Sequence, residues 1–191
     1  MTTLEQVLKA NRSFVDNLPQ AYDDAEEDSK KPNKHLAIFT CMDTRLVDFL
    51  EPALGIKRGE AKVIKNAGNS VTGPFEATIR SLIVGIFELD VKEVMVIGHY
   101  DCGVAHSTSQ GVVEKMLARG IAPEAIKMVE DELEAWIDTF HHPWDNVEHV
   151  VDKIRNNPLI PIDVPIHGLM FNPKTGEIEV VVDGYLMAKT L

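Results

Sequence analysis

The sequence predicts an α/β fold, with a mostly parallel central β-sheet flanked by helices, an N-terminal helical arm and a C-terminal antiparallel edge strand. Short apolar runs of strand length alternate with longer segments whose apolar residues repeat at helical spacing. A turn-rich stretch, residues 172–176, joins the last two apolar runs, which indicates a hairpin. At 191 residues, the chain is long enough to form one domain with its own core.

Composition narrows the class of protein. Apolar residues make up 45% and charged residues 26%, as in ordinary soluble globular proteins. A net charge of −11 argues against a nucleic-acid partner and against binding to an anionic membrane surface. No run approaches the ~20 apolar residues that span a bilayer, and the N-terminus has no secretory signal pattern. We therefore expect a cytoplasmic protein, whose two cysteines are thiols in a reducing compartment.

The N-terminal segment is expected to lie outside the main core. Residues 4–18 form an amphipathic pattern that Pro19 ends, and residues 23–34 are highly charged and almost without apolar side chains. We interpret residues 1–34 as a helical arm followed by an acidic loop. Residues 35–191 then form the α/β core of a single domain, 1–191.

The first half of the core alternates strands with helices. Strands are expected over residues 35–40, 61–65 and 93–98, and helices over residues 44–54 and 74–89. The second strand runs into a turn-rich loop at residues 66–69.

The second half of the core begins with helices and ends with the hairpin. Helices are expected over residues 112–118, 123–140 and 144–154, and the final strands over residues 164–171 and 177–182.

Two motifs carry the chemistry: Cys41-Met42-Asp43-Thr44-Arg45 and His99-Tyr100-Asp101-Cys102-Gly103. Each follows a predicted strand, and ligands of parallel sheets bind beyond the carboxyl ends of the strands. Cys41 and His99 lie 58 residues apart, too far for a zinc finger but suited to neighbouring strands. His99 and Cys102 are three residues apart, so one helical turn would point both side chains the same way.

Two thiolates and one imidazole, from Cys41, Cys102 and His99, indicate a catalytic zinc site with an open fourth position. Zinc lowers the pKa of a bound water towards neutrality and so produces a hydroxide nucleophile. Two thiolates nominally cancel the charge of the metal, so we expect this water to titrate at or above neutral pH. Asp43 either accepts a hydrogen bond from the hydroxide or binds zinc itself, and Arg45 can hold that carboxylate bidentately.

Each motif also has a simpler interpretation. A cysteine at a strand end is often a small buried apolar residue, and Asp43 could cap a helix while Arg45 is solvated. We interpret His35, His106 and His167 as structural. The histidines at positions 141, 142 and 149 are better explained as an exposed helix junction than as a metal site. No glycine-rich nucleotide-binding pattern follows any strand, so no nucleotide cofactor is expected.

Taken together, the motifs resemble those of the β-class carbonic anhydrases, whose signatures are Cys-x-Asp-Ser/Thr-Arg and His-x-x-Cys-Gly. The loop Asn66-Ala67-Gly68-Asn69 fits the same family, and the likeness is to its short prokaryotic and archaeal branch. This resemblance implies one zinc ion per chain, bound by Cys41, His99 and Cys102, with Asp43 and Arg45 as the catalytic dyad. Two features depart from the family: Lys65 stands where it often has arginine, and residues 104–161 match nothing that can be carried over.

The implied activity is that of a lyase, a carbonate dehydratase that hydrates carbon dioxide reversibly to bicarbonate and a proton by zinc-bound hydroxide. The resemblance also implies a homodimer whose N-terminal helices embrace the partner, with dimers that in some members pair into tetramers. Three alternatives remain open at this point. They are a zinc hydrolase of carbon disulfide or carbonyl sulfide, a non-catalytic zinc scaffold closed by Asp43, and a hydrolase with a cysteine nucleophile.

Overall fold

The computed structural model describes residues 1–19, 22 and 30–188, and the chain divides into two compact units, residues 1–30 and 31–191. The predicted arm and core meet close to this division. Residues 23–29 of the predicted acidic loop lie outside the described residues. The assignment of residues 1–191 to a single domain stays a prediction.

The first unit contains helix α1, Thr3–Asp16. Its start is fixed by a capping box, in which the Thr2 side chain accepts the Glu5 backbone N–H and the Glu5 carboxylate accepts the Thr2 backbone N–H. The helix buries none of its residues, and its apolar side chains are exposed. It ends two residues before the predicted limit, because Asn17 takes a non-helical conformation.

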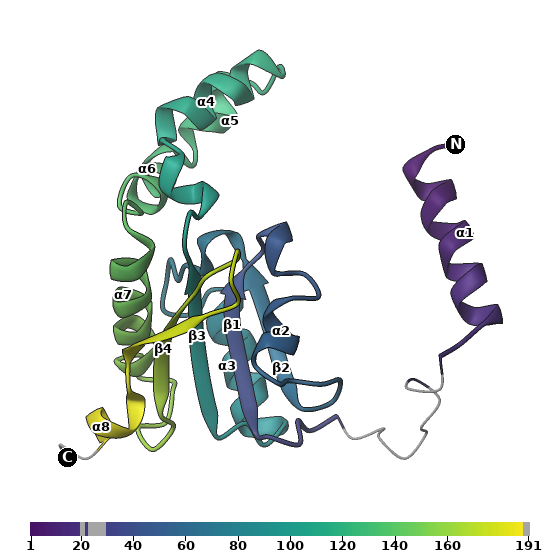
Figure 1. Ribbon diagram of the computed structural model, residues 1–191. Coiled ribbons are helices and arrows are strands. Elements are labelled where there is room, and N and C mark those ends of the chain that lie inside the picture. The colour runs from purple at the N-terminus through teal and green to yellow at the C-terminus, as the bar shows by residue number, and fades with distance from the viewer. Residues whose placement is uncertain (20–21, 23–29, 189–191) are drawn as a thin grey trace. The chain divides into compact units, whose positions relative to one another are not determined.

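The second unit is built on a five-stranded sheet with the order β2-β1-β3-β4-β5 (Figure 1). The strands are β1 Leu36–Cys41, β2 Ala61–Asn66, β3 Glu93–His99, β4 Ile166–Phe171 and β5 Ile178–Val182. The first four run parallel to one another, and β5 runs antiparallel to β4. This confirms the predicted mostly parallel sheet and its antiparallel edge strand.

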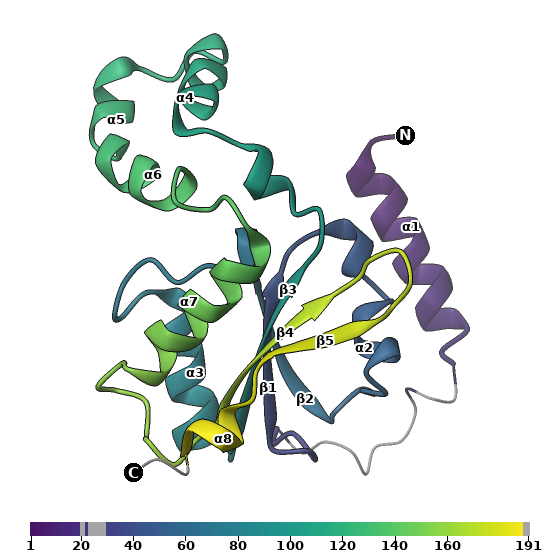
Figure 2. The same ribbon diagram turned by 60° about the vertical axis from the view of Figure 1, so that its left-hand side comes forward.

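Both faces of the sheet are covered (Figure 2). Helices α3, Ala77–Glu88, and α7, Pro143–Arg155, pack on one face, and the short helix α2, Leu50–Ala53, packs on the other. All six residues of β1 are buried, and the side chains of residues 36–39 alternate between the two core clusters. Continuous burial of this kind is typical of a parallel strand between two layers of helices.

The order of the strands places a crevice between β1 and β3. From β1 the chain first adds β2 on one side and then β3 on the other. The connections therefore change direction at β1, and ligands of such sheets bind at this point, beyond the carboxyl ends of the strands. The pairing of Thr40 with Ile97, reinforced by a 2.8 Å hydrogen bond from Thr40 Oγ1 to the Ile97 carbonyl, brings the two strand ends level.

Helices α4, α5 and α6 form an excursion between β3 and α7, beyond the carboxyl ends of the strands (Figures 1 and 2). Their bounds are Ser109–Ala118, Pro123–Lys127 and Glu130–Ile137. The two ends of the excursion are tied together, because the Ser109 backbone N–H donates to Asp138 Oδ1 at 2.8 Å.

Two predicted helices are wrong because the backbone breaks inside them. Residues 44–54 form a 3-10 turn, η3 Thr44–Leu46, and then α2, with Asp48 between them at a left-handed φ of 53°. Residues 123–140 are interrupted at Val129, whose φ of −126° and ψ of 4° are not helical. Conformations of this kind depend on packing around the residue and leave no mark in the apolar periodicity.

The remaining helices are short or begin at a capping side chain. The short ones are η4 Ala67–Asn69, η5 Gly103–His106 and α8 Gly184–Ala188. Helix α3 begins three residues later than predicted, because the Glu76 carboxylate caps the Ile79 N–H. In the described residues, no helix has both the length and the apolar character needed to cross a bilayer.

Gly98, next to His99 in β3, allows α7 to approach the sheet closely. A Cβ atom on Gly98 would lie 2.5 Å from Val147 Cγ2 and 3.0 Å from Met170 Sδ. We expect Gly98→Ala to cost about 1–3 kcal/mol through overpacking. This corresponds to a decrease in Tm of roughly 2–12 °C for a chain of this size.

Gly85→Ala in α3 is the matched control, because its Cβ would meet only Val91, at 3.4 Å or more. Alanine is a better helix former than glycine, so the Tm of this variant should be unchanged or higher. Thermal unfolding followed by circular dichroism measures both. Equal melting of Gly98→Ala and the wild type would contradict the close approach of α7.

Candidate metal centre

The three predicted ligands meet at the carboxyl end of the sheet. Cys41 is the last residue of β1, His99 is the last residue of β3, and Cys102 follows on the next turn of chain. All three are buried, with 4%, 1% and 1% of their surface exposed. Their ligand atoms lie within 4.8 Å of one another, and among the described residues no other group of His, Cys, Asp and Glu could hold a metal ion.

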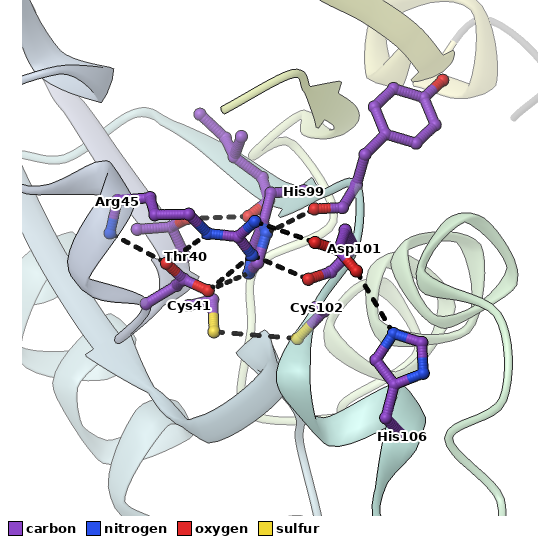
Figure 3. A network of polar contacts seen from close by, with 10 residues as sticks. Thr40, Cys41, Arg45, His99, Asp101, Cys102 and His106 are labelled. Atoms are coloured by element: carbon purple, nitrogen blue, oxygen red, sulfur yellow. Dashed lines mark hydrogen bonds and ion pairs between the residues drawn. The ribbon is translucent and has the colours of Figure 1, made fainter. Parts of the chain in front are cut away.

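The distance between the two sulfur atoms suits a metal ion. Cys41 Sγ and Cys102 Sγ are 4.0 Å apart and face each other (Figure 3). Two sulfurs bound to one tetrahedral zinc at about 2.3 Å would lie roughly 3.8 Å apart. Both cysteines are free thiols. The pair is therefore spaced as it would be when both sulfurs share one metal ion.

His99 presents one ring nitrogen to the same space. Its Nδ1 donates to the Tyr100 carbonyl at 3.0 Å, which fixes the tautomer and leaves a lone pair on Nε2. Nε2 is buried and is one of three such side-chain atoms, among those the structure describes, without a hydrogen-bond partner. A buried polar atom without a partner is costly, and a metal ion would satisfy this one.

The spacing of His99 and Cys102 predicted a helical turn, but the turn between these residues is not helical. Asp101 takes a left-handed φ of 56°, and η5 starts only at Gly103. This sharp turn brings both side chains to one side by a different route. The predicted convergence is therefore right, and the predicted helical turn is wrong.

The two thiols differ in acidity. The hydrogen bond from the Cys102 thiol is the main cause that lowers the pKa of Cys41, with smaller contributions from the backbone N–H groups of Gly68 and Asp43. The same hydrogen bond, together with burial, raises the pKa of Cys102. Cys41 is therefore poised as a thiolate, the form in which cysteine binds metals.

Asp43 and Arg45 form a second group beside the ligands. Arg45 Nε donates to Asp43 Oδ1 at 3.0 Å, and Arg45 Nη2 donates to Asp43 Oδ2 at 2.9 Å, a bidentate pair. Asp43 Oδ1 also caps η3 by accepting the Arg45 backbone N–H at 2.8 Å. The capping role given by the simpler interpretation is therefore present, but its solvated Arg45 is not, because Asp43 and Asp101 hold the guanidinium. The hydrogen bonds from Arg45 lower the pKa of Asp43 to about 2.

The Asp43 carboxylate lies next to the position where the three ligands converge. Its Oδ2 is 3.8 Å from His99 Nε2. Because both of its oxygens are already held by Arg45, the carboxylate is kept in one orientation. It is ionised at any pH near neutrality and can only accept hydrogen bonds.

Sequence reasoning missed two residues on the exposed side of the site. Asp101 Oδ2 accepts from Arg45 Nη1 at 3.0 Å, and its Oδ1 lies 3.3 Å from His106 Nε2 (Figure 3). Asp101 lies inside the second motif and was therefore visible in the sequence, but no local pattern indicates its contact with Arg45. His106, interpreted from the sequence as structural, is a partner of Asp101.

Of the other histidines, the exposed His149 lies inside α7 and not at the helix junction where the sequence placed it. His141 and His142 are exposed and precede the first residue of α7, which makes them a helix junction. His35 contacts Asp90, and His167 contacts Glu93.

The donor set selects among metals. Two thiolates and an imidazole are soft and borderline ligands, which suit zinc and not the hard cations magnesium and calcium. Three protein ligands leave one tetrahedral position for water or substrate, as in catalytic zinc sites. The residues thus fit a zinc ion with one open position.

Comparison with known proteins agrees with this chemistry. The family model described as carbonic anhydrase matches residues 36–178, which include both motifs. The chain belongs to the carbonic anhydrase family. The resemblance to the β class is confirmed, since a crystal structure of β-carbonic anhydrase isoform I from Trichomonas vaginalis is 42% identical, with a TM-score of 0.89. The match covers 97% of this chain and 100% of that one.

Curated relatives extend the comparison. YvdA and YtiB of Bacillus subtilis (strain 168), provisionally named carbonic anhydrases, are 39% and 40% identical over 188 residues. Each match covers 97% of this chain, and 94% and 99% of the relatives. A carbon disulfide hydrolase of Acidianus sp. (strain A1-3) is 30% identical over 158 residues, which cover 75% of both chains. The carbonic anhydrase family thus includes proteins that differ in substrate.

We predict that the purified protein binds one zinc ion per chain and that His99→Gln removes most of this affinity. Removal of a group that only hydrogen-bonds to a metal ligand lowers metal affinity roughly 10–100-fold, and removal of the ligand itself should lower it further. Elemental analysis and competition with a chelator measure zinc content and affinity. His106→Gln is the matched control, because it changes a neighbouring exposed histidine and should leave zinc content unchanged. Full zinc retention in His99→Gln would contradict the ligand assignment.

Proposed function

We propose that this protein hydrates carbon dioxide reversibly to bicarbonate and a proton, as a zinc-dependent carbonate dehydratase. One observation carries the proposal: three buried ligand atoms converge beside a carboxylate that an arginine holds in place. These are the sulfurs of Cys41 and Cys102 and the unpartnered Nε2 of His99. Membership of the carbonic anhydrase family supports the choice of reaction.

In this proposal, Cys41, His99 and Cys102 hold the zinc ion. When bound, zinc acts as a Lewis acid that makes water a nucleophile near neutral pH. Backbone groups support the ligands: the Tyr100 carbonyl accepts from His99 Nδ1, and the N–H groups of Gly68 and Val104 donate to the sulfurs of Cys41 and Cys102. These two N–H groups fix the position of each sulfur and moderate its negative charge.

Asp43 is proposed to orient the attacking water. Its carboxylate is ionised, faces the ligand atoms and can only accept, so a water O–H beside it points towards Asp43 and a lone pair points away. Arg45 holds both carboxylate oxygens and thereby keeps Asp43 from turning towards the metal. This bidentate pair argues against the scaffold hypothesis, in which Asp43 would close the site as a fourth ligand.

The second candidate function is hydrolysis of carbon disulfide or carbonyl sulfide. The match to the carbon disulfide hydrolase of Acidianus favours it, because that relative shows that the family includes this activity. Carbon dioxide remains the main proposal, because relatives that are 39–42% identical over 97% of this chain are named as carbonic anhydrases.

A homodimer is the proposed minimal assembly. Helix α1 supports this assembly, because six apolar residues in the helix or just after it are each exposed by 45% or more. A partner would cover the apolar surface that they form. These residues are Leu4, Val7, Leu8, Phe14, Val15 and Leu18.

We expect light scattering to show a dimer, or a tetramer of paired dimers, and the double variant Leu4→Ser, Leu8→Ser to weaken it. Lys9→Ser on the same helix is the control that alters a polar position. A monomer at all concentrations tested would overturn the proposed assembly.

The cytoplasm is the proposed location. It is supported by the two free cysteines, 4.0 Å apart, because a disulfide between them would remove two of the three ligands. Recovery of the protein from an oxidising compartment with this disulfide formed would contradict the proposal.

Stopped-flow measurement of carbon dioxide hydration on protein of known zinc content tests the function. We expect activity that follows zinc content and rises between pH ~6.5 and ~9. Because the pKa of Asp43 is about 2, this carboxyl is fully ionised throughout that range, so the rise reports on the nucleophile.

Asp43→Ala should lower kcat roughly 10–100-fold while zinc remains bound. Asp152→Ala, an exposed aspartate of α7, is the matched control and should keep full activity. Full activity in Asp43→Ala would refute its role. Sulfide release from carbon disulfide, without hydration of carbon dioxide, would favour the second candidate.

A further inference from the structure

Asp101 makes contacts that no step of the proposed function uses. It lies between the ligands His99 and Cys102, and its side chain reaches across to the first motif. Arg45 donates to it twice, from Nη1 to the Asp101 carboxylate at 3.0 Å and from Nη2 to the Asp101 carbonyl at 2.7 Å. The second motif thus holds the arginine of the first (Figure 3).

With these contacts, four of the five N–H donors of the Arg45 guanidinium have an acceptor. Nε is taken by Asp43, Nη1 by Asp101, and Nη2 by both aspartates. A guanidinium held by Asp43 alone could swing with its partner. Held from the opposite side by Asp101, it is fixed relative to the chain that carries two metal ligands.

The backbone of Asp101 adopts a conformation that favours glycine. Its φ of 56° lies in the left-handed region, which costs a residue with a Cβ atom more than it costs glycine. This conformation aims the Asp101 carbonyl at Arg45 Nη2. A glycine would make the turn more easily but could not supply the carboxylate.

The Asp101 carboxylate adds little to stability, so its contribution is to geometry. Its side chain is 63% exposed, and ion pairs of this kind are worth little in water. Its other oxygen lies 3.3 Å from His106 Nε2, on the exposed side of the site. This contact limits rotation of the carboxylate and keeps Oδ2 directed at Arg45.

We propose that Asp101 is a positioning residue, which fixes the Arg45 guanidinium and through it the orientation of Asp43. The proposal rests on the proposed function for its kinetic consequence, but the Arg45 geometry can be tested without activity. It explains why a glycine-like position carries an aspartate, and why a single turn carries His99, Asp101 and Cys102 together.

Asp101→Gly and Asp101→Asn separate this role from a structural one. If the turn needs only a left-handed residue, Asp101→Gly should be as active as the wild type or more so. If Asp101 positions Arg45, Asp101→Gly should lower kcat about tenfold at unchanged zinc content and unchanged Tm. Asp101→Asn should be intermediate, because its amide oxygen can still accept from Arg45 Nη1.

Asp90→Gly is the matched control. Asp90 also has a left-handed φ, 61°, and lies just before β3, away from the metal ligands. Asp90→Gly also replaces a left-handed aspartate by glycine, but Asp90 does not contact Arg45. The kcat of this variant should therefore equal that of the wild type.

A double-mutant cycle with Arg45→Ala asks whether Asp101 acts through Arg45. If it does, adding Asp101→Gly to the Arg45→Ala variant should not lower kcat any further. An equal tenfold loss in both backgrounds would overturn the proposal, as would wild-type kcat in Asp101→Gly.

A readout without activity comes from ¹⁵N NMR of the Arg45 guanidinium, assigned with Arg45→Lys. The wild type should show slow rotation about the Nε–Cζ bond, and Asp101→Gly should show averaged Nη signals. Unchanged signals would overturn the proposal. If the wild type failed to hydrate carbon dioxide, the proposed function would fail while this measurement still decided the role of Asp101.

Discussion

The metal centre depends on the parallel pairing of β1 with β3. These strands carry Cys41 and His99 at their carboxyl ends, and their register runs from Leu36 paired with Glu93 to Thr40 paired with Ile97. Since β2 and β3 lie on opposite sides of β1, the chain leaves a crevice between the two strand ends. Any slip of this register would move one ligand by a full residue, about 3.3 Å, and separate the sulfur from the imidazole. The apolar core on both faces of the sheet is therefore what sets the geometry of the ligands.

Burial of the ligands links metal binding to the fold. Three polar side chains lie almost wholly inside the protein, yet most of their hydrogen-bonding capacity is directed locally. The Tyr100 carbonyl accepts from His99, and the N–H groups of Gly68 and Val104 donate to the sulfurs. What remains unsatisfied is His99 Nε2, and the free energy of metal binding offsets the cost of burying it. Binding of a metal to the folded state alone also stabilises that state.

The exposed side of the site has a different character from the buried ligands. Asp43, Arg45, Asp101 and His106 form a chain of contacts in which each side chain limits the rotation of the next. Such contacts add little to stability in water, because solvent screens them. Their effect is to hold one carboxylate in one orientation beside the ligand atoms. The fold thus supplies the ligands from strand ends, whose positions the core fixes, and supplies the orienting groups from short turns.

The sequence by itself determined the strands, the sheet type and the hairpin, and it singled out the candidate ligands and the proposed dyad, because apolar periodicity and residue chemistry are local properties. Local patterns could not show the breaks at Asp48 and Val129, since both interrupt a continuous apolar periodicity through backbone conformations that packing selects. Nor could they show that Asp101 reaches Arg45, 56 residues away along the chain. Contacts of this kind exist only once β1 and β3 have paired. The sequence therefore specified the reacting groups, and tertiary structure decided their distances and orientations.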